Sequence, residues 1–156
     1  MPLDNRGPWI TTFSGKIFHL HDPSVDEVHI EDVGHALGMK CRFQGQSKYF
    51  YSVAEHCYWG STIVREDYAL AFLLHEVSET YLADVVSPHK PFVRVKLGLG
   101  DVYVTQPWKA LELMHTNVIC RAIGFDSPER IGHPYIKNAD NVMFNWEAKH
   151  LRKLNP

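Results

Sequence analysis

The stretch from Leu70 to Lys90, LAFLLHEVSETYLADVVSPHK, joins the most hydrophobic run of the chain to several side chains that can do chemistry. His75, Glu76, Glu79 and Asp84 follow directly after apolar helix formers. At helical spacing His75 and Glu79 share one face, and Glu76 lies beside them. An imidazole next to carboxylates at the end of a buried helix predicts a metal site. A core histidine bonded to a surface glutamate is the simpler alternative.

Two distant residues strengthen the metal hypothesis. Ser52 and Glu55 form a capping-box pattern, which places His56 just inside a helix. Asp140 lies beside the apolar stripe of the last predicted helix, where a carboxylate needs a cation or a salt bridge to a lysine. Each alone has a structural explanation, since a helix histidine is often a satisfied core residue. Together they complete a ligand set suited to a divalent transition ion: His56, His75, Glu76 and Asp140.

Helices must hold these residues, and hydrophobic periodicity with start and stop signals predicts five. They span residues 30–41, 52–64, 66–83, 107–123 and 134–154. The fourth is closed by Gly124, and Ser87-Pro88 with Pro91 interrupts the pattern after the third. An N-terminal β-hairpin is predicted over residues 9–19, with its turn at Ser14-Gly15. The loop 42–49 places Arg42 and Phe43.

Composition bounds the remaining possibilities. The chain has 156 residues, of which 45% are hydrophobic and 22% are charged, and this predicts one globular domain over residues 1–156. A net charge of −2 argues against binding to duplex nucleic acid. The three cysteines have no C-x-x-C spacing, so reduced core thiols are expected. No long apolar span is apparent, and we expect a soluble, cytoplasmic protein without membrane partners.

The ordered motifs resemble those of the HD-domain phosphohydrolases. The motifs are SVAEH at 52–56, LLHEVSE at 73–79, AD at 83–84, PHK at 88–90 and IKNAD at 136–140. The similarity runs from about residue 30 to residue 151. It is greatest to small bacterial 5'-deoxynucleotidases and to bacteriophage deoxynucleoside triphosphate triphosphohydrolases, including those that remove dATP.

The resemblance implies an all-α, HD-type helical bundle with one divalent ion, either Mn, Co, Zn or Fe. The ion would be held by the four residues named above. A deoxynucleotide substrate is implied, with a cytoplasmic location, in the host cytoplasm for a phage protein. A homo-oligomer, either a dimer or a hexamer, is also implied.

Roles for further residues follow from the same resemblance. Glu79 would position or activate the attacking water, and Asp84 would lie near the sugar 3'-hydroxyl. Arg42 would contact phosphate. Phe43 would pack against the deoxyribose and leave no room for a 2'-hydroxyl.

Three more residues match positions around the substrate. Lys90 and Lys137 correspond to phosphate-binding positions. His35 either contacts substrate, supports the site from outside the metal shell, or is a buried helix histidine. Glu76 departs from the family, which has Asp there, and the longer side chain alters metal preference.

The expected activity is hydrolysis of a deoxynucleoside triphosphate, dATP first, to the nucleoside and tripolyphosphate. Three cations, Arg42, Lys90 and Lys137, are more than a monophosphate requires. A 5'-deoxynucleotidase acting on monophosphates is the alternative, in which two of these cations form structural ion pairs. The sequence is also compatible with a nucleotide-binding sensor that has a degenerate His-Glu centre, and with a purely structural helical domain.

Overall fold

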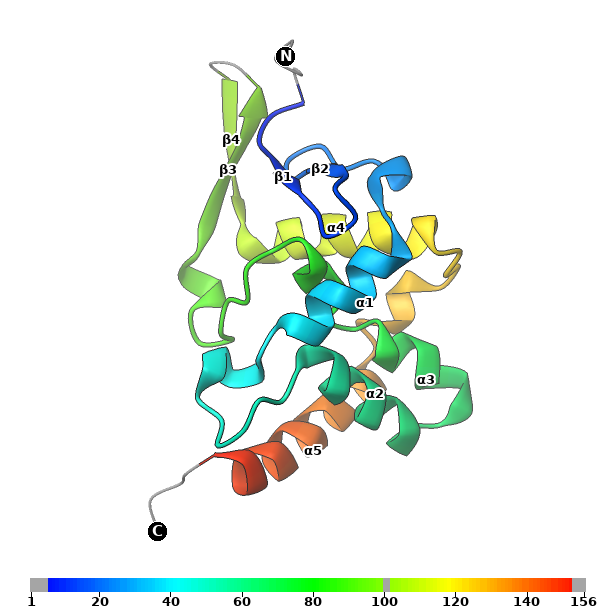
Figure 1. Cartoon of the computed structure of the whole chain (residues 1–156). Coiled ribbons are helices and arrows are strands. Elements are labelled where there is room, and N and C mark those ends of the chain that lie inside the picture. The colour runs from blue at the N-terminus through cyan, green and yellow to red at the C-terminus, as the bar shows by residue number, and fades with distance from the viewer. Residues whose placement is uncertain (1–5, 100–101, 153–156) are drawn as a thin grey trace. The chain divides into compact units, whose positions relative to one another are not determined.

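The computed structural model describes residues 6–99 and 102–152, which are mainly helical, as the sequence predicts (Figure 1). The five helices of this part are α1 Ile30–Met39, α2 Val53–Ile63, α3 Glu66–Leu73, α4 Trp108–Ala122 and α5 Pro134–Leu151. The strands are β1 Trp9–Thr11, β2 Ile17–His19, β3 Arg94–Leu99 and β4 Val102–Pro107. None of the helices described has the length and apolar character needed to cross a membrane.

The chain folds into two compact units, each made from two separate stretches of sequence. The first unit comprises residues 1–36 and 78–125, and the second comprises residues 37–77 and 126–156. Strands β1 to β4 and helix α4 belong to the first unit, while α2, α3 and α5 belong to the second. The expectation that all 156 residues form a single domain stays a prediction.

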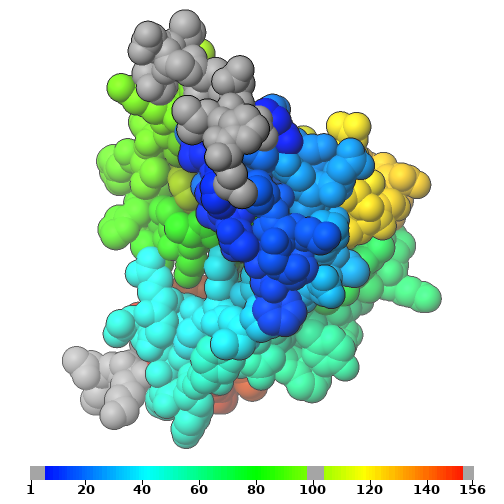
Figure 2. All heavy atoms as spheres, turned by 45° about the horizontal axis from the view of Figure 1, so that its top comes forward, coloured from blue at the N-terminus to red at the C-terminus, as the bar shows by residue number. Residues whose placement is uncertain are grey.

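The predicted N-terminal hairpin is confirmed. Strands β1 and β2 pair antiparallel, and Gly15 in the turn has a φ of 79°. The backbone N–H and hydroxyl of Ser14 donate to the two carboxylate oxygens of buried Asp32, at 2.7 and 2.9 Å. Phe18 is fully buried and stacks on Tyr81 with ring centroids 3.6 Å apart. The hairpin is therefore fixed to the rest of the first unit, and it forms part of the surface seen in dark blue in Figure 2.

A second hairpin, β3–β4, is absent from the sequence prediction. The strands pair antiparallel from Arg94 opposite Pro107, and they join α4 in a core around Trp108 and Leu111. Val95 and Leu97 pack against this core, while Lys96 between them does not belong to it. This alternation is a strand signal. The prolines before it suggest only an interrupted helix.

The second unit is built from the packing of α2 against α3 and α5. The capping box is confirmed: the Glu55 N–H donates to the Ser52 hydroxyl at 3.0 Å, and the Ser52 N–H donates to the Glu55 carboxylate at 2.7 Å. Gly60 of α2 faces the ring of Phe72 on α3, in a space too small for any side chain. This close approach brings the two helices together.

The predicted third helix is too long. Helix α3 ends at Leu73, and a turn leads to a short 3₁₀ segment, Val77–Thr80. The carbonyl of Phe72 accepts from the backbone N–H of His75 at 3.2 Å and from its ring Nδ1 at 2.6 Å. A continuing α-helix would have paired this carbonyl with the N–H of Glu76, four residues on. The histidine side chain competes with the helix and bends the chain.

The last two helices follow their predicted starts. Helix α4 ends at Ala122, and Gly124 with a φ of 74° supplies the expected C-terminal cap. Helix α5 begins at Pro134 and ends at Leu151, three residues before the predicted end at Leu154, which lies outside the described residues.

Candidate metal centre

Four predicted ligands meet in the second unit. Each offers one ligand atom, and these atoms all lie within 4.8 Å of one another. One comes from α2, one from α5, and two from the turn after α3. The residues are His56, Asp140, His75 and Glu76. No second group of three or more such residues occurs in the part of the chain described.

The spacing of these atoms is slightly wider than that of ligands around one ion. The two imidazole Nε2 atoms lie 3.2 Å apart, and Asp140 Oδ1 lies 3.3 Å from His56 Nε2 and 3.6 Å from His75 Nε2. Glu76 Oε1 lies 3.7 Å from His75 Nε2. Ligand atoms about 2.0–2.1 Å from a common ion are separated by about 2.8–3.4 Å at octahedral (neighbouring) or tetrahedral angles. Small side-chain adjustments would bring all four to such a centre.

Hydrogen bonds fix the tautomers of both histidines. His56 Nδ1 lies 2.7 Å from Glu147 Oε1, and His75 Nδ1 lies 2.6 Å from the carbonyl oxygen of Phe72. A carboxylate and a carbonyl only accept, so both Nδ1 atoms carry the proton. Each Nε2 therefore presents a lone pair toward the other. Two lone pairs at this separation are stable only with positive charge between them.

The pKa shifts of His75 and Asp140 also indicate that the cluster favours a positive charge. Burial lowers the pKa of His75, but the hydrogen bonds with Asp140 and Cys57 and the charge of Glu76 together outweigh it, and the pKa lies well above its ordinary value. Burial raises the pKa of Asp140, but hydrogen bonds from His56 and His75 outweigh it and hold this pKa below its usual range. A divalent ion or a proton supplies the charge that the cluster attracts.

Arg42 joins the cluster to a second buried carboxylate. Its NH1 lies 3.4 Å from Glu76 Oε1, and its NH2 lies 3.4 Å from Glu147 Oε2. Burial lowers the pKa of Arg42, but Glu147 and Glu76 outweigh it, so the pKa is raised and the guanidinium stays charged. Its Nε–H is buried and has no acceptor among the described residues. One donor of Arg42 is therefore still available.

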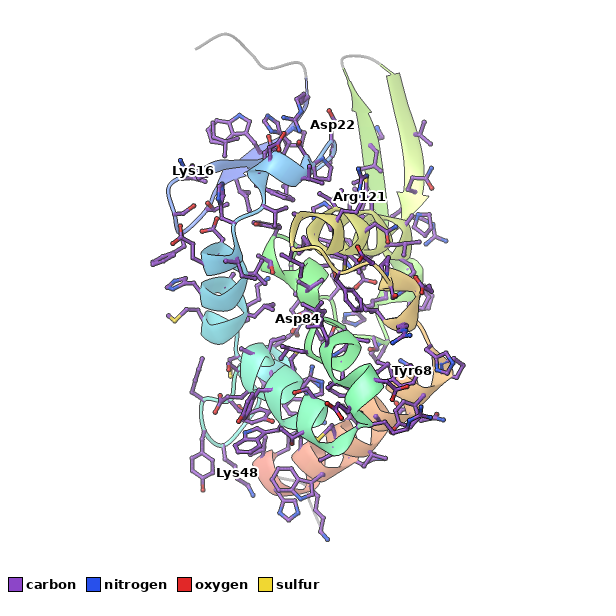
Figure 3. All side chains as sticks on the ribbon, turned by 90° about the vertical axis from the view of Figure 1, so that its right-hand side faces the viewer. Lys16, Asp22, Lys48, Tyr68, Asp84 and Arg121 are labelled. Carbon is purple, nitrogen blue, oxygen red and sulfur yellow. The ribbon has the colours of Figure 1, made fainter. Side chains whose placement is uncertain are left out.

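Phe43 lies next to Arg42 in a strained loop. Phe43 and Gln44 have φ values of 56° and 52°, an unusual left-handed conformation for residues other than glycine. The Phe43 ring lies 5.6 Å from the Arg42 guanidinium and 5.5 Å from that of Arg152. The loop is anchored to the end of α5, where the backbone N–H of Lys48 donates to Leu151 O at 2.7 Å; Figure 3 labels Lys48.

The remaining predicted site residues are distributed between the two units. Lys137 is exposed on α5, one turn before Asp140. Glu79 is buried in the 3₁₀ segment of the first unit, and Asp84, labelled in Figure 3, is half-buried. The roles expected of Glu79 and Asp84 stay predictions.

Lys90 and His35 each have a side-chain contact that bears on the alternatives given for them. Lys90 Nζ lies 2.7 Å from Glu112 Oε1 in the first unit, so this ammonium forms an ion pair. His35 is exposed and stacks on Phe13 with ring centroids 3.7 Å apart. The alternative of a buried helix histidine at this position is therefore wrong.

Glu147 is the residue that the sequence interpretation missed. Two apolar residues of α5, Val142 and Trp146, are exposed, whereas Glu147 is fully buried. Its position seven residues after Asp140 puts both carboxylates on one face of the helix. That spacing was the available signal.

Comparison with known proteins gives relatives without an assigned function. No protein-family model matches the sequence. The chain is 33% identical over 132 residues to "Uncharacterized protein YfdR" of Escherichia coli strain K12, covering 76% of this chain and 74% of the relative. It is 31% identical over 159 residues to "Uncharacterized protein RCAP_rcc00048" of Rhodobacter capsulatus, covering 92% and 72%. The chain therefore belongs to the same family as these two proteins.

Proposed function

We propose that this protein is a divalent-metal-dependent phosphohydrolase of the HD type that acts on deoxynucleotides. The observation that carries the proposal is the convergence of two Nε2 lone pairs with Asp140 and Glu76 at the spacing of metal ligands. Two imidazoles with two carboxylates suit Mn, Fe, Co or Zn. The fixed Nδ1 protons support a binding role, because they leave each Nε2 free to coordinate.

A divalent ion in this centre would polarise a phosphoryl oxygen and lower the pKa of water. The side chains around the centre would bind the substrate. The Nε–H of Arg42, which has no acceptor in the described residues, would donate to a phosphoryl oxygen. Phe43 would pack against the deoxyribose. The strain in its backbone supports a functional role, since such strain clusters at binding sites.

Further roles in this proposal rest on the family resemblance alone. Glu79 would orient the attacking water, and Asp84 would bind the sugar 3'-hydroxyl. Lys90 and Lys137 match phosphate-binding positions of the family, where they would neutralise charge that develops during displacement at phosphorus.

The size of the phosphate group separates two substrates within this proposal. The sequence favours a deoxynucleoside triphosphate, with dATP first, because three cations stand outside the metal shell. Arg42 and Lys90 both form ion pairs with carboxylates, at 3.4 and 2.7 Å. In the alternative of a 5'-deoxynucleotidase, two of the three cations form structural ion pairs, as Arg42 and Lys90 do. The ion pairs therefore favour monophosphates as the second candidate.

Metal analysis and a substrate panel test the proposal together. Protein purified without chelator should carry about one transition ion per chain. With manganese, cobalt or zinc it should then release orthophosphate or tripolyphosphate from a deoxynucleotide, and less from the ribonucleotides. Metal without turnover on any nucleotide would point to a sensor. Absence of bound metal would leave a structural helical domain.

A further inference from the structure

Glu147 is an unusual residue for the interior of a helix bundle. Its side chain is fully buried, and α5 places it two turns after Asp140. An isolated carboxylate in such a place would take up a proton, because an unpaired buried charge is strongly unfavourable. The partners of Glu147 therefore decide what it does.

The two oxygens of Glu147 are divided between two partners. Oε1 accepts from His56 Nδ1 at 2.7 Å, and Oε2 lies 3.4 Å from the NH2 of Arg42. The guanidinium provides the counter-charge, and the two carboxylate oxygens act as acceptors for these donors. His56 must then carry its proton on Nδ1.

We propose that Glu147 is a positioning residue for the metal centre, with Arg42 as its counter-ion. It selects the His56 tautomer whose Nε2 can coordinate, and it fixes the orientation of the ring. The inference rests on the proposed metal site and assigns a role to a residue outside the ligand set. Carboxylates that hold a ligating histidine in this way commonly raise metal affinity by about ten- to a hundredfold.

The two histidines are held by different means. His75 is oriented by the backbone carbonyl of Phe72, which no side-chain substitution removes. The Nδ1 hydrogen bond of His56 depends on a single side chain, which α5 supplies along with the ligand Asp140. A change at Glu147 should therefore act on His56 and leave His75 in place.

Glu147→Gln is the informative substitution because it is nearly isosteric. If the new amide oxygen accepts from His56 Nδ1, the amide NH2 meets the Arg42 guanidinium, and donor faces donor. If the amide is reversed, it donates to Nδ1 and moves the histidine proton to Nε2, where it blocks coordination. Either arrangement weakens metal binding.

The test measures metal affinity with zinc and cobalt in the wild type, in Glu147→Gln and in Asp32→Asn. Asp32 is an equally buried carboxylate whose partner is Ser14 of the first unit, so its substitution controls for the loss of a buried charge. We expect affinity to fall by about ten- to a hundredfold in Glu147→Gln. The visible spectrum of bound cobalt should also change in this variant. Asp32→Asn should lower stability but leave both metal readouts unchanged.

Nitrogen NMR of histidine-labelled, zinc-loaded wild type tests the same inference when the variant does not fold. His56 should show a proton on Nδ1 and zinc on Nε2, and zinc on Nδ1 would overturn the proposal. Wild-type affinity in a folded Glu147→Gln variant would also overturn it while leaving the metal centre intact. A wild type that binds no transition ion would instead refute the proposed function.

Discussion

At the scale of single residues, the metal hypothesis depends on where the protons and lone pairs of two histidines lie. Both Nδ1 atoms donate to oxygen acceptors, so both Nε2 atoms face the space shared with Asp140. Glu76 completes the set from the residue after His75, close enough to interact with Arg42 as well. The carboxylate of Glu76, which is longer than that of an aspartate, can therefore interact with both the metal centre and the Arg42 guanidinium.

Removing a ligand should remove the metal. In His75→Ala and Asp140→Ala we expect loss of stoichiometric metal and of hydrolysis, because the remaining atoms no longer surround an ion. Helical content should stay largely intact. Metal analysis and circular dichroism check both points, with Asn141→Ala as the control, since Asn141 is the exposed neighbour of Asp140. Stoichiometric metal in both ligand variants would show that the site is assigned wrongly.

Glu79 separates chemistry from binding. If it orients water and is not a ligand, Glu79→Ala should keep metal and nucleotide affinity but lose turnover by roughly two orders of magnitude or more, as for loss of an acid-base group. Metal titration and steady-state kinetics measure the two effects separately. Unchanged turnover would mean that another carboxylate acts on the water.

At the scale of elements, Gly60 controls the packing of α2 on α3. A Cβ at this position would lie 1.9 Å from Phe72 Cε1, so the ring or the helix must move. We expect Gly60→Ala to destabilise the protein by about 1–3 kcal/mol, the usual cost of overpacking. Gly34→Ala on α1 is the matched control, because nothing lies within 4 Å of its added methyl group. That change should stabilise by up to about 1 kcal/mol through helix propensity. Urea unfolding of both variants checks the signs, and a stable Gly60→Ala protein would contradict this packing.

The contact between Asp32 of α1 and the β1–β2 turn should depend on pH. Burial raises the pKa of Asp32, but hydrogen bonds from Ser14 outweigh it, so the pKa in the folded state is lowered. The carboxylate therefore stabilises the fold above its unfolded pKa of about 3.9, and this contribution is lost as pH falls through the folded pKa. Asp32→Asn should cost about 1–3 kcal/mol at neutral pH. The difference from wild type should shrink as the pH falls below the unfolded value and through the lower pKa of the folded state. A difference that stays constant with pH would rule out this ionic contribution.

At the scale of the whole molecule, elements with local signals were predictable from the sequence. The Ser52 capping box, the turn at Gly15 and the cap at Gly124 each depend on a few neighbouring residues, and all three are confirmed. The grouping of the four ligands also follows the prediction, because residue type and order were informative. Non-local effects were not predictable. Strands β3 and β4 are stabilised by each other and by α4.

The sequence prediction was wrong about the end of α3 and missed the buried Glu147, and in both cases the reason is a specific side-chain contact. Apolar periodicity continues past Leu73, but the ring of His75 takes the Phe72 carbonyl and ends α3. A glutamate in a helix is expected at the surface, but hydrogen-bonding partners from distant parts of the second unit, His56 and Arg42, allow Glu147 to be buried. Burial of a charged group depends on what the fold brings to it.

Within the proposed function, the number of cations that can reach phosphate distinguishes the two candidate substrates. Arg42 is engaged by two carboxylates, and Lys90 is engaged by Glu112. Lys137 is exposed on the helix that carries Asp140, and it forms no ion pair within the described residues. If the substrate is a triphosphate, the distal phosphates should depend on this ammonium more than the phosphate at the metal does.

Lys137→Ala should therefore lower kcat/KM for a deoxynucleoside triphosphate, dATP first, by about tenfold or more, the value of a charge-assisted hydrogen bond. The loss on the corresponding monophosphate should be smaller, because in the proposed site the metal and Arg42 would hold that phosphate. Lys149→Ala, an exposed lysine three turns further along α5, controls for a general change in surface charge. Rates of tripolyphosphate and orthophosphate release from both substrates give the comparison.

Equal losses on the two substrates would contradict the triphosphate assignment. Orthophosphate release from monophosphates with no activity on any triphosphate would instead identify a 5'-deoxynucleotidase, in which the ion pairs of Arg42 and Lys90 are permanent structural features.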